Sequence, residues 1–225
     1  MEFNKQTSTV RSSASEAIID QGLRAYMLKV YNYMASGVLL TGVISLLVFK
    51  FSGGMNITLG PTGFTGLTDP FGELLFNSGF KWLVMLAPLG IVMYLSFGIS
   101  KMSASKAQST FWVFAALMGA SLASIFIVYT QMSIARVFFI TSGTFGAMSI
   151  YGYTTKRDLT KLGSFLMMGL FGIIIASLVN IFMKSTMMYF VISILGVLIF
   201  VGLTAYDTQK IKNMYTASDS GELMG

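Results

Sequence analysis

Long apolar stretches without a charged residue alternate with short polar segments along most of the chain. A helix needs about 20 apolar residues to cross the hydrocarbon core of a bilayer. Such a helix also pairs every backbone N–H and C=O within its own segment, as lipid requires. The pattern therefore predicts an all-α polytopic membrane protein with six transmembrane helices. The predicted spans are 30–49, 82–100, 110–131, 137–155, 162–183 and 185–206.

The segments outside the spans complete the predicted organisation. A polar tail covers residues 1–25, the helical bundle covers 26–214, and a second polar tail covers 215–225. The one long connection, from about residue 51 to 80, is rich in Gly and Thr and holds two of the three prolines. This composition is typical of turns rather than regular structure. We favour a variable connection over a lid for this loop.

The composition supports a membrane protein and argues against most enzymes. Hydrophobic residues make up 54% of the chain and charged residues only 11%, whereas soluble domains carry about 25% charged residues. The chain has no Cys and no His, which excludes disulfides, Ser-His-Asp triads and the usual zinc sites. An aspartyl intramembrane protease needs two facing carboxylates, and only one is in reach of a span. We expect no enzymatic activity, no metal site and no cofactor.

The basic residues predict the orientation. Most of the 15 basic residues lie on the side that carries both chain ends, which the positive-inside rule places in the cytoplasm. They are Lys5, Arg11, Arg24, Lys29, Lys101, Lys106, Lys156, Arg157, Lys161, Lys210 and Lys212. The opposite side has Lys50, Lys81, Arg136 and Lys184. Topology explains this distribution better than nucleic-acid binding does, so we expect no nucleic-acid partner.

Two residues within the spans could shape a path through the membrane. Pro88 lies in the middle of the second span, where it predicts a kink, either static or part of a gate. Asn180 is the most polar residue in the fifth span. It could line a cavity, and a hydrogen bond to a neighbouring helix explains it equally well.

Asp207 is the acidic residue that is continuous with a transmembrane run, and it stands three residues before Lys210. One interpretation is an interfacial ion pair of the i,i+3 kind, worth about 0.2–0.5 kcal/mol. The other is a carboxylate at the mouth of a pore, which titrates with pH and attracts cations. From the spacing alone we favour the ion pair.

The stretch GLTAYDTQKIK, residues 202–212, resembles the signature of the Bax inhibitor-1 family, specifically its bacterial branch. FWVFAALMGASLASIFIVYT in the third span, SIARVFFITSGTFGAMSIYGYTTKRDL through the fourth and SFLMMGLFGIIIASLVNIF in the fifth are similar to that family as well. The resemblance implies a helical bundle around a central seventh helix, in the bacterial inner membrane. It also implies a pH-sensitive leak channel for Ca²⁺.

The resemblance further implies roles for individual residues. Asp207 matches one of two aspartates that form the family's pH sensor; the other belongs to the seventh helix. Two carboxylates in contact cannot both ionise easily, so loss of a shared proton would separate the helices and open the path. Lys101 is a candidate for the basic latch, where the family has an arginine, and Lys210 is a second candidate. The chain stops at Gly225, where the seventh helix would start, so we expect a fragment or a short form.

The alternative function is a non-channel regulator. Bacterial members of the family are linked to a membrane-anchored ATP-dependent protease, so the resemblance also implies a protein that binds and modulates such a protease or a stress-response complex. The polar N-terminal tail is the feature that a cytoplasmic partner would grip. The expected partners are therefore the lipid bilayer, Ca²⁺ as a permeant ion, and a membrane protease.

Overall fold

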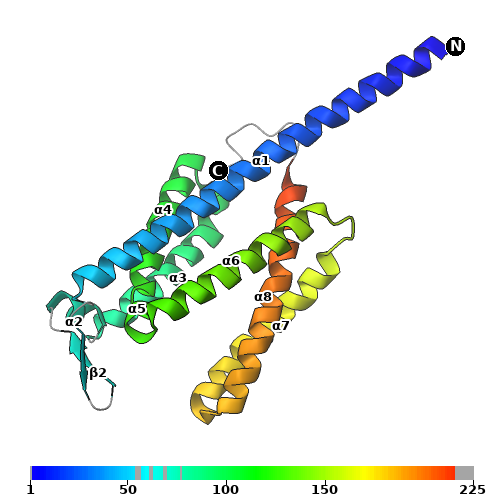
Figure 1. Cartoon of the computed structure of the whole chain (residues 1–225). Helices are drawn as coiled ribbons and strands as arrows, with labels where there is room; N and C mark the ends of the chain where they lie inside the picture. The colour runs from blue at the N-terminus through cyan, green and yellow to red at the C-terminus, as the bar shows by residue number, and fades with distance from the viewer. Residues whose placement is uncertain (1, 54–56, 61–62, 68–69, 77, 216–225) are drawn as a thin grey trace. The chain divides into compact units, whose positions relative to one another are not determined.

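A computed structural model describes residues 2–53, 57–60, 63–67, 70–76 and 78–215. Helices account for most of them (Figure 1). The helices are α1 (Glu2–Phe51), α2 (Pro70–Phe76), α3 (Phe80–Gly98), α4 (Ala104–Leu122), α5 (Ile125–Val128), α6 (Gln131–Thr154), α7 (Thr160–Met183) and α8 (Thr186–Met214). A 3₁₀ turn covers Ile99–Lys101, and two short strands are β1 (Ile57–Gly60) and β2 (Gly63–Leu67).

Six helical segments among the described residues are long and apolar enough to cross a membrane. They are Gln21–Phe51, Phe80–Gly98, Ala104–Val128, Gln131–Thr154, Thr160–Met183 and Thr186–Met214. Many of their large apolar side chains point outward; Phe182 is 87% exposed and Phe97 is 79% exposed. Water would make such exposure unfavourable, whereas lipid tails accept it. The predicted class of all-helical membrane protein with six spans is confirmed.

The loop between α1 and α3 differs from the expectation of turns alone. β1 and β2 form an antiparallel hairpin in which Ile57 lies opposite Leu67 and Gly60 lies opposite Gly63. Isoleucine, threonine and phenylalanine in these segments favour extended structure. Helix α2 then begins at Pro70, whose fixed φ suits the first position of a helix. The composition of the loop concealed these short elements because glycine is its commonest residue.

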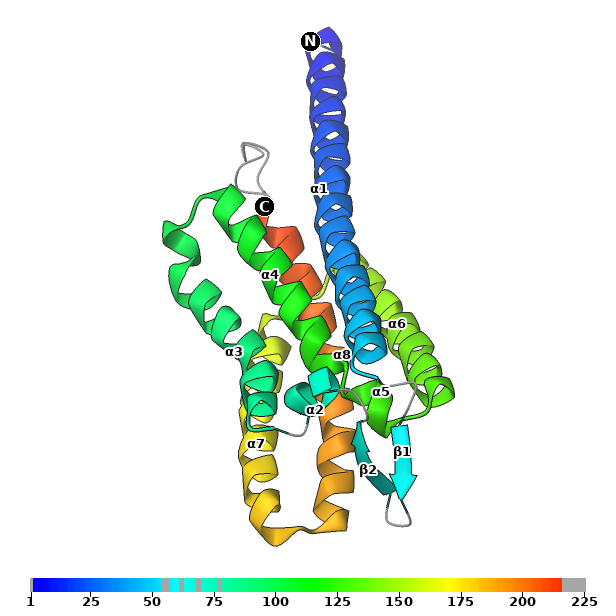
Figure 2. The same ribbon diagram turned by 90° about the vertical axis from the view of Figure 1, so that its left-hand side faces the viewer.

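The described residues form two compact units, of which the first ends at Ala135. In the first unit α4 packs against α1 and α3, and α1 and α4 run side by side (Figure 2). Thr41 Oγ1 of α1 donates a hydrogen bond to the carbonyl of Ala115 at 2.9 Å. A Cβ built at Gly119 would lie only 2.6 Å from the carbonyl oxygen of Thr41. Small residues therefore let these two helices approach closely.

The second unit begins at Arg136 and contains most of α6 with α7 and α8. α7 and α8 form an antiparallel hairpin that packs along its length (Figure 1). Glycines again mark the closest contacts. A Cβ at Gly163 would lie 2.5 Å from the ring of Tyr206, and one at Gly202 would lie 2.5 Å from Leu166.

Candidate functional site

Helix α8 carries the whole signature stretch, residues 202–212. The predicted span ends at Tyr206, and the helix continues beyond it to Met214. No proline or glycine interrupts these last turns, so the backbone bonds of the helix can continue into the polar region. The side chains after Tyr206 therefore take their directions from regular helical register.

The first contact of the signature is between the backbones of α8 and α6. A Cβ built at Gly152 would lie 3.0 Å from the carbonyl carbon and the Cα of Ala205, and closer still to its carbonyl oxygen. Ala205 is only 1% exposed. Glycine at position 152 is therefore required for the approach of the two helices, because any larger side chain meets rigid backbone.

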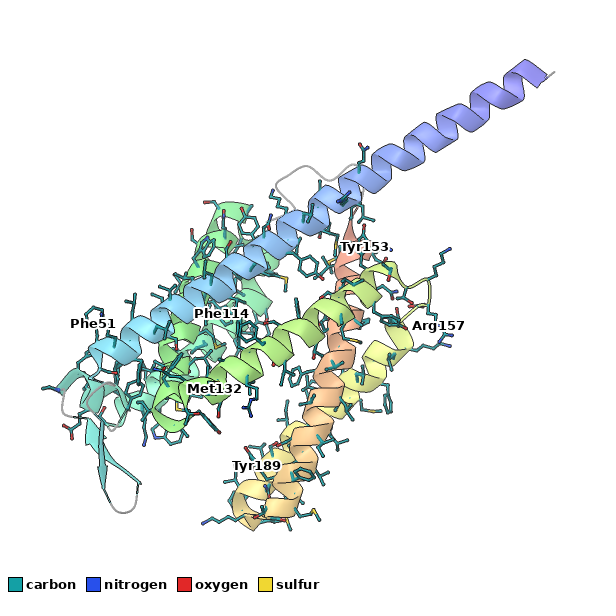
Figure 3. All side chains as sticks on the ribbon, in the orientation of Figure 1. Phe51, Phe114, Met132, Tyr153, Arg157 and Tyr189 are labelled. Atoms are coloured by element: carbon teal, nitrogen blue, oxygen red, sulfur yellow. The ribbon has the colours of Figure 1, made fainter. Side chains whose placement is uncertain are left out.

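Gln209 forms the second contact, with the connection between α6 and α7. Its Nε2 donates a hydrogen bond to the carbonyl of Arg157 at 2.8 Å. Its Oε1 accepts a hydrogen bond from the N–H of Leu159 at 2.9 Å. Figure 3 shows Arg157 on this connection, beyond the end of α6. One amide thus satisfies two backbone groups that lie outside any helix.

Lys212 forms the third contact, at the end of α6. Its Nζ donates a hydrogen bond to the carbonyl of Tyr153 at 2.7 Å and lies 5.1 Å from the centre of the Tyr153 ring. Tyr153 belongs to the last turn of α6, where carbonyls have no partner within the helix. A cation at this position also complements the negative end of the helix dipole.

Asp158 lies in the connection between α6 and α7 and caps the start of α7. Its Oδ1 accepts hydrogen bonds from the N–H of Thr160 at 2.9 Å and from Thr160 Oγ1 at 2.6 Å. These two bonds, with the nearby charge of Lys161, lower the pKa of Asp158 below its ordinary value of 3.8. The N-cap position, Leu159, provides no side-chain bond, so Asp158 supplies the cap from one residue earlier.

Asp207 and Lys210 lie on an exposed part of the same helix. Lys210 is close enough to act on Asp207 electrostatically, as expected for residues three apart on a helix. Among the residues that the structure describes, none forms a hydrogen bond or direct ion pair with Asp207. The signature therefore contains one carboxylate that the local fold does not use.

The other sequence-predicted residues lie elsewhere. Pro88 is buried inside α3, and Lys101 is exposed at the end of the 3₁₀ turn. Asn180 closes the turn between α7 and α8: its Oδ1 accepts a hydrogen bond from the N–H of Ser185 at 3.0 Å. Its carbonyl accepts one from the N–H of Lys184 at 2.7 Å. The path or latch roles of these residues stay predictions.

Sequence reasoning did not identify Gln209, Lys212 or Asp158 as contacts of one site. Their partners are mostly backbone atoms, which leave no trace in residue type.

In the described part of the chain no group of three or more acidic, histidine or cysteine side chains could hold a metal ion. The contacts of Gln209, Lys212 and Gly152 form a junction of α6, α7 and α8, and Asp158 and Asp207 are exposed carboxylates beside it.

The comparison with known protein families agrees with the signature. The family model described as "Inhibitor of apoptosis-promoting Bax1" matches residues 23–225. The chain belongs to the Bax inhibitor-1 family. As a member of this family with six apolar helices, it is an integral membrane protein.

Bacterial proteins are similar to this family member over most of its length. An uncharacterized protein of Rickettsia prowazekii is 46% identical over 217 residues, which cover 96% of this chain and 85% of the relative. The inner membrane protein YbhL of Escherichia coli is 44% identical over 207 residues, or 91% of this chain and 81% of YbhL. An uncharacterized protein of Caulobacter vibrioides is 38% identical, over 95% of this chain and 83% of that protein. No solved structure matches the chain.

Proposed function

We propose that this Bax inhibitor-1 family protein is a pH-sensitive cation leak channel for Ca²⁺, in which Asp207 is part of the pH sensor. The observation that supports it is that residues of the signature differ in their contacts. Gln209 and Lys212 bind backbone groups of the neighbouring elements, whereas Asp207 is exposed. An exposed carboxylate at the end of a spanning helix is available to a proton, a cation or a second carboxylate.

The chemistry of the sensor follows from carboxylates in contact. A second carboxylate placed against Asp207 would share a proton with it, because two adjacent negative charges repel each other. Deprotonation would then push the two groups apart and open a path. Lys210, or Lys101 from the 3₁₀ turn, would serve as the basic latch that favours the closed arrangement. Pro88 and Asn180 are candidates for the kink and the lining of the path.

The proposed setting is the inner membrane of a bacterium. YbhL, the Escherichia coli relative, is named as an inner membrane protein. The bias of basic residues supports a cytoplasmic N-terminus. On this orientation the signature end of α8 faces the cytoplasm, and the protein acts without enzymatic chemistry.

Reconstitution tests the channel. The purified protein in liposomes that contain a Ca²⁺ indicator should admit Ca²⁺ at a rate that changes across the neutral pH range. Asp207→Asn should abolish the pH response because the amide does not titrate. Glu73→Gln, the same chemical change in α2, is the matched control and should leave the response intact. Retention of both flux and pH response by Asp207→Asn would show that the mechanism is wrong.

A second candidate function is the regulation of a membrane-anchored ATP-dependent protease or stress-response complex. The length of α1 favours it. The helix begins at Glu2, whereas its apolar span begins at Gln21. At 1.5 Å per residue the preceding turns extend about 30 Å beyond the span. A partner could bind such a projecting helix. Removal of residues 2–20 should then abolish co-purification of the protease and leave any Ca²⁺ flux unchanged.

A further inference from the structure

Three hydrogen bonds of the second unit share one feature: a side chain of α8 binds the backbone of the α6–α7 junction. The donors and acceptors are separated by 50, 52 and 59 positions in the sequence. They involve only two residues of α8, Gln209 and Lys212. The three backbone partners lie within a short stretch, from Tyr153 to Leu159.

We propose that Gln209 and Lys212 are positioning residues that clamp the α6–α7 connection to α8, so that the connection moves with the turn that carries Asp207. This inference rests on the proposed function, because it assigns the clamp to the positioning of the sensor residue. A displacement of Asp207 relative to α6 and α7 must then break the Gln209 and Lys212 bonds.

Helical register separates the clamp from the sensor residue. Ala205, Gln209 and Lys212 follow one another at spacings of four and three, so they occupy one face of α8. That face meets α6 at Gly152 and the connection at Leu159. Asp207 is two residues from both Ala205 and Gln209, and residues two apart do not share a helix face. The last turns of α8 therefore hold the junction with one face and expose Asp207 on another.

The clamp binds the backbone of the connection rather than its side chains. All three bonds end on a backbone N–H or C=O, while the side chains of Lys156 and Arg157 are exposed. Changes to those two side chains should therefore be tolerated. Changes to Gln209 leave the buried Leu159 with an unpaired N–H, which a buried site tolerates poorly.

Amide hydrogen exchange of residues 155–160 tests the clamp on the full-length protein in lipid nanodiscs. Gln209→Leu should accelerate exchange of the Leu159 amide roughly fivefold, the factor expected for one lost hydrogen bond. Gln209→Glu keeps an acceptor for this N–H and should give an intermediate rate. Lys212→Met should accelerate exchange in the last turn of α6 and the start of the connection.

Matched controls separate the clamp from general destabilisation. Gln108→Leu removes another long-range glutamine bond, that of Nε2 to Tyr33 Oη at 3.0 Å, and should leave residues 155–160 unchanged. Arg157→Ala should also leave their exchange unchanged, because only its backbone carbonyl is used. Equal exchange in Gln209→Leu and wild type, or acceleration in Arg157→Ala as large as in Gln209→Leu, would overturn the clamp.

The pH profile of Ca²⁺ flux distinguishes positioning from a purely structural bond. Gln209→Leu should shift the pH of half-maximal flux, whereas Gln108→Leu should not. Faster exchange with an unchanged pH profile would overturn the positioning role. If the wild-type protein carries no Ca²⁺ at any pH, the proposed function fails, and the exchange result alone upholds or overturns the clamp.

Discussion

The two ends of the α7–α8 hairpin are held by different kinds of bonds. Figure 3 shows Tyr189 near one end and Arg157 at the other. At the first end, Asn180 accepts hydrogen bonds from the N–H groups of Lys184 and Ser185 at 2.7 and 3.0 Å, and these partners lie no more than five positions from it in the sequence. At the second end, Gln209 reaches partners 50 and 52 positions away.

The difference lies in how far along the sequence each end must reach for its partners. A turn closed by neighbouring residues forms from local sequence, as Asn180 does by capping two N–H groups. A junction of three separate segments needs particular residues on one of them to reach the others. The residues of the signature in α8 supply those contacts, so the junction depends on their identity.

The largest effect is expected from a substitution that disrupts the junction at its closest backbone contact. Gly152→Ala should lower the free energy of unfolding by about 1–3 kcal/mol, the usual cost of overpacking, because the new Cβ meets the backbone of Ala205. Gly146→Ala in the same helix is the control, since no described atom beyond its chain neighbours and its own helix backbone lies within 4 Å of its Cβ position. Unfolding in detergent measures both. A loss in the control equal to that in Gly152→Ala would contradict the close contact.

A smaller effect is expected at the other end of the hairpin. Asn180→Ala should lower the free energy of unfolding by about 1 kcal/mol, because it removes the side-chain bond to the N–H of Ser185. Amide exchange should accelerate at residues 183–186 and stay unchanged at residues 155–160. Acceleration at the distant segment would mean that the two ends of the hairpin do not close independently.

The smallest effect concerns the acid sensitivity of the connection. Hydrogen bonds from Thr160 and the charge of Lys161 lower the pKa of Asp158 in the folded protein below 3.8, so the charged carboxylate stabilises the start of α7. This contribution is complete above pH 3.8 and disappears as the pH falls through the lowered pKa. Titration of the Asp158 carboxyl by NMR should give a midpoint below 3.8. A midpoint at or above that value would refute the cap, and Asp158→Asn should abolish the titration.

The apolar pattern was sufficient to predict the six spans, because a bilayer imposes both length and composition on them. It was not sufficient for the loop hairpin, whose strands Ile57–Gly60 and Gly63–Leu67 are short and rich in glycine. The end of α8 was also missed, since Asp207 and Lys210 interrupt the apolar run without ending the helix.

The candidate site was predictable only in part. The signature pointed to Asp207, and its exposure could not be deduced from residue type. The contacts of Gln209 and Lys212 end on backbone atoms, and every residue has the same backbone groups. Asn180 was placed within the fifth span, as a candidate for lining a cavity or bonding a neighbouring helix, and its side chain caps the turn after α7.

The central claim is that the signature has two separable parts, a face that holds the junction and a carboxylate that the junction does not need. Amide exchange of residues 155–160, compared between Asp207→Asn and Gln209→Leu, tests it most directly. We predict wild-type exchange in Asp207→Asn and faster exchange in Gln209→Leu. Equal acceleration in both variants would show that Asp207 also stabilises the junction and would contradict the claim that the two parts are separable.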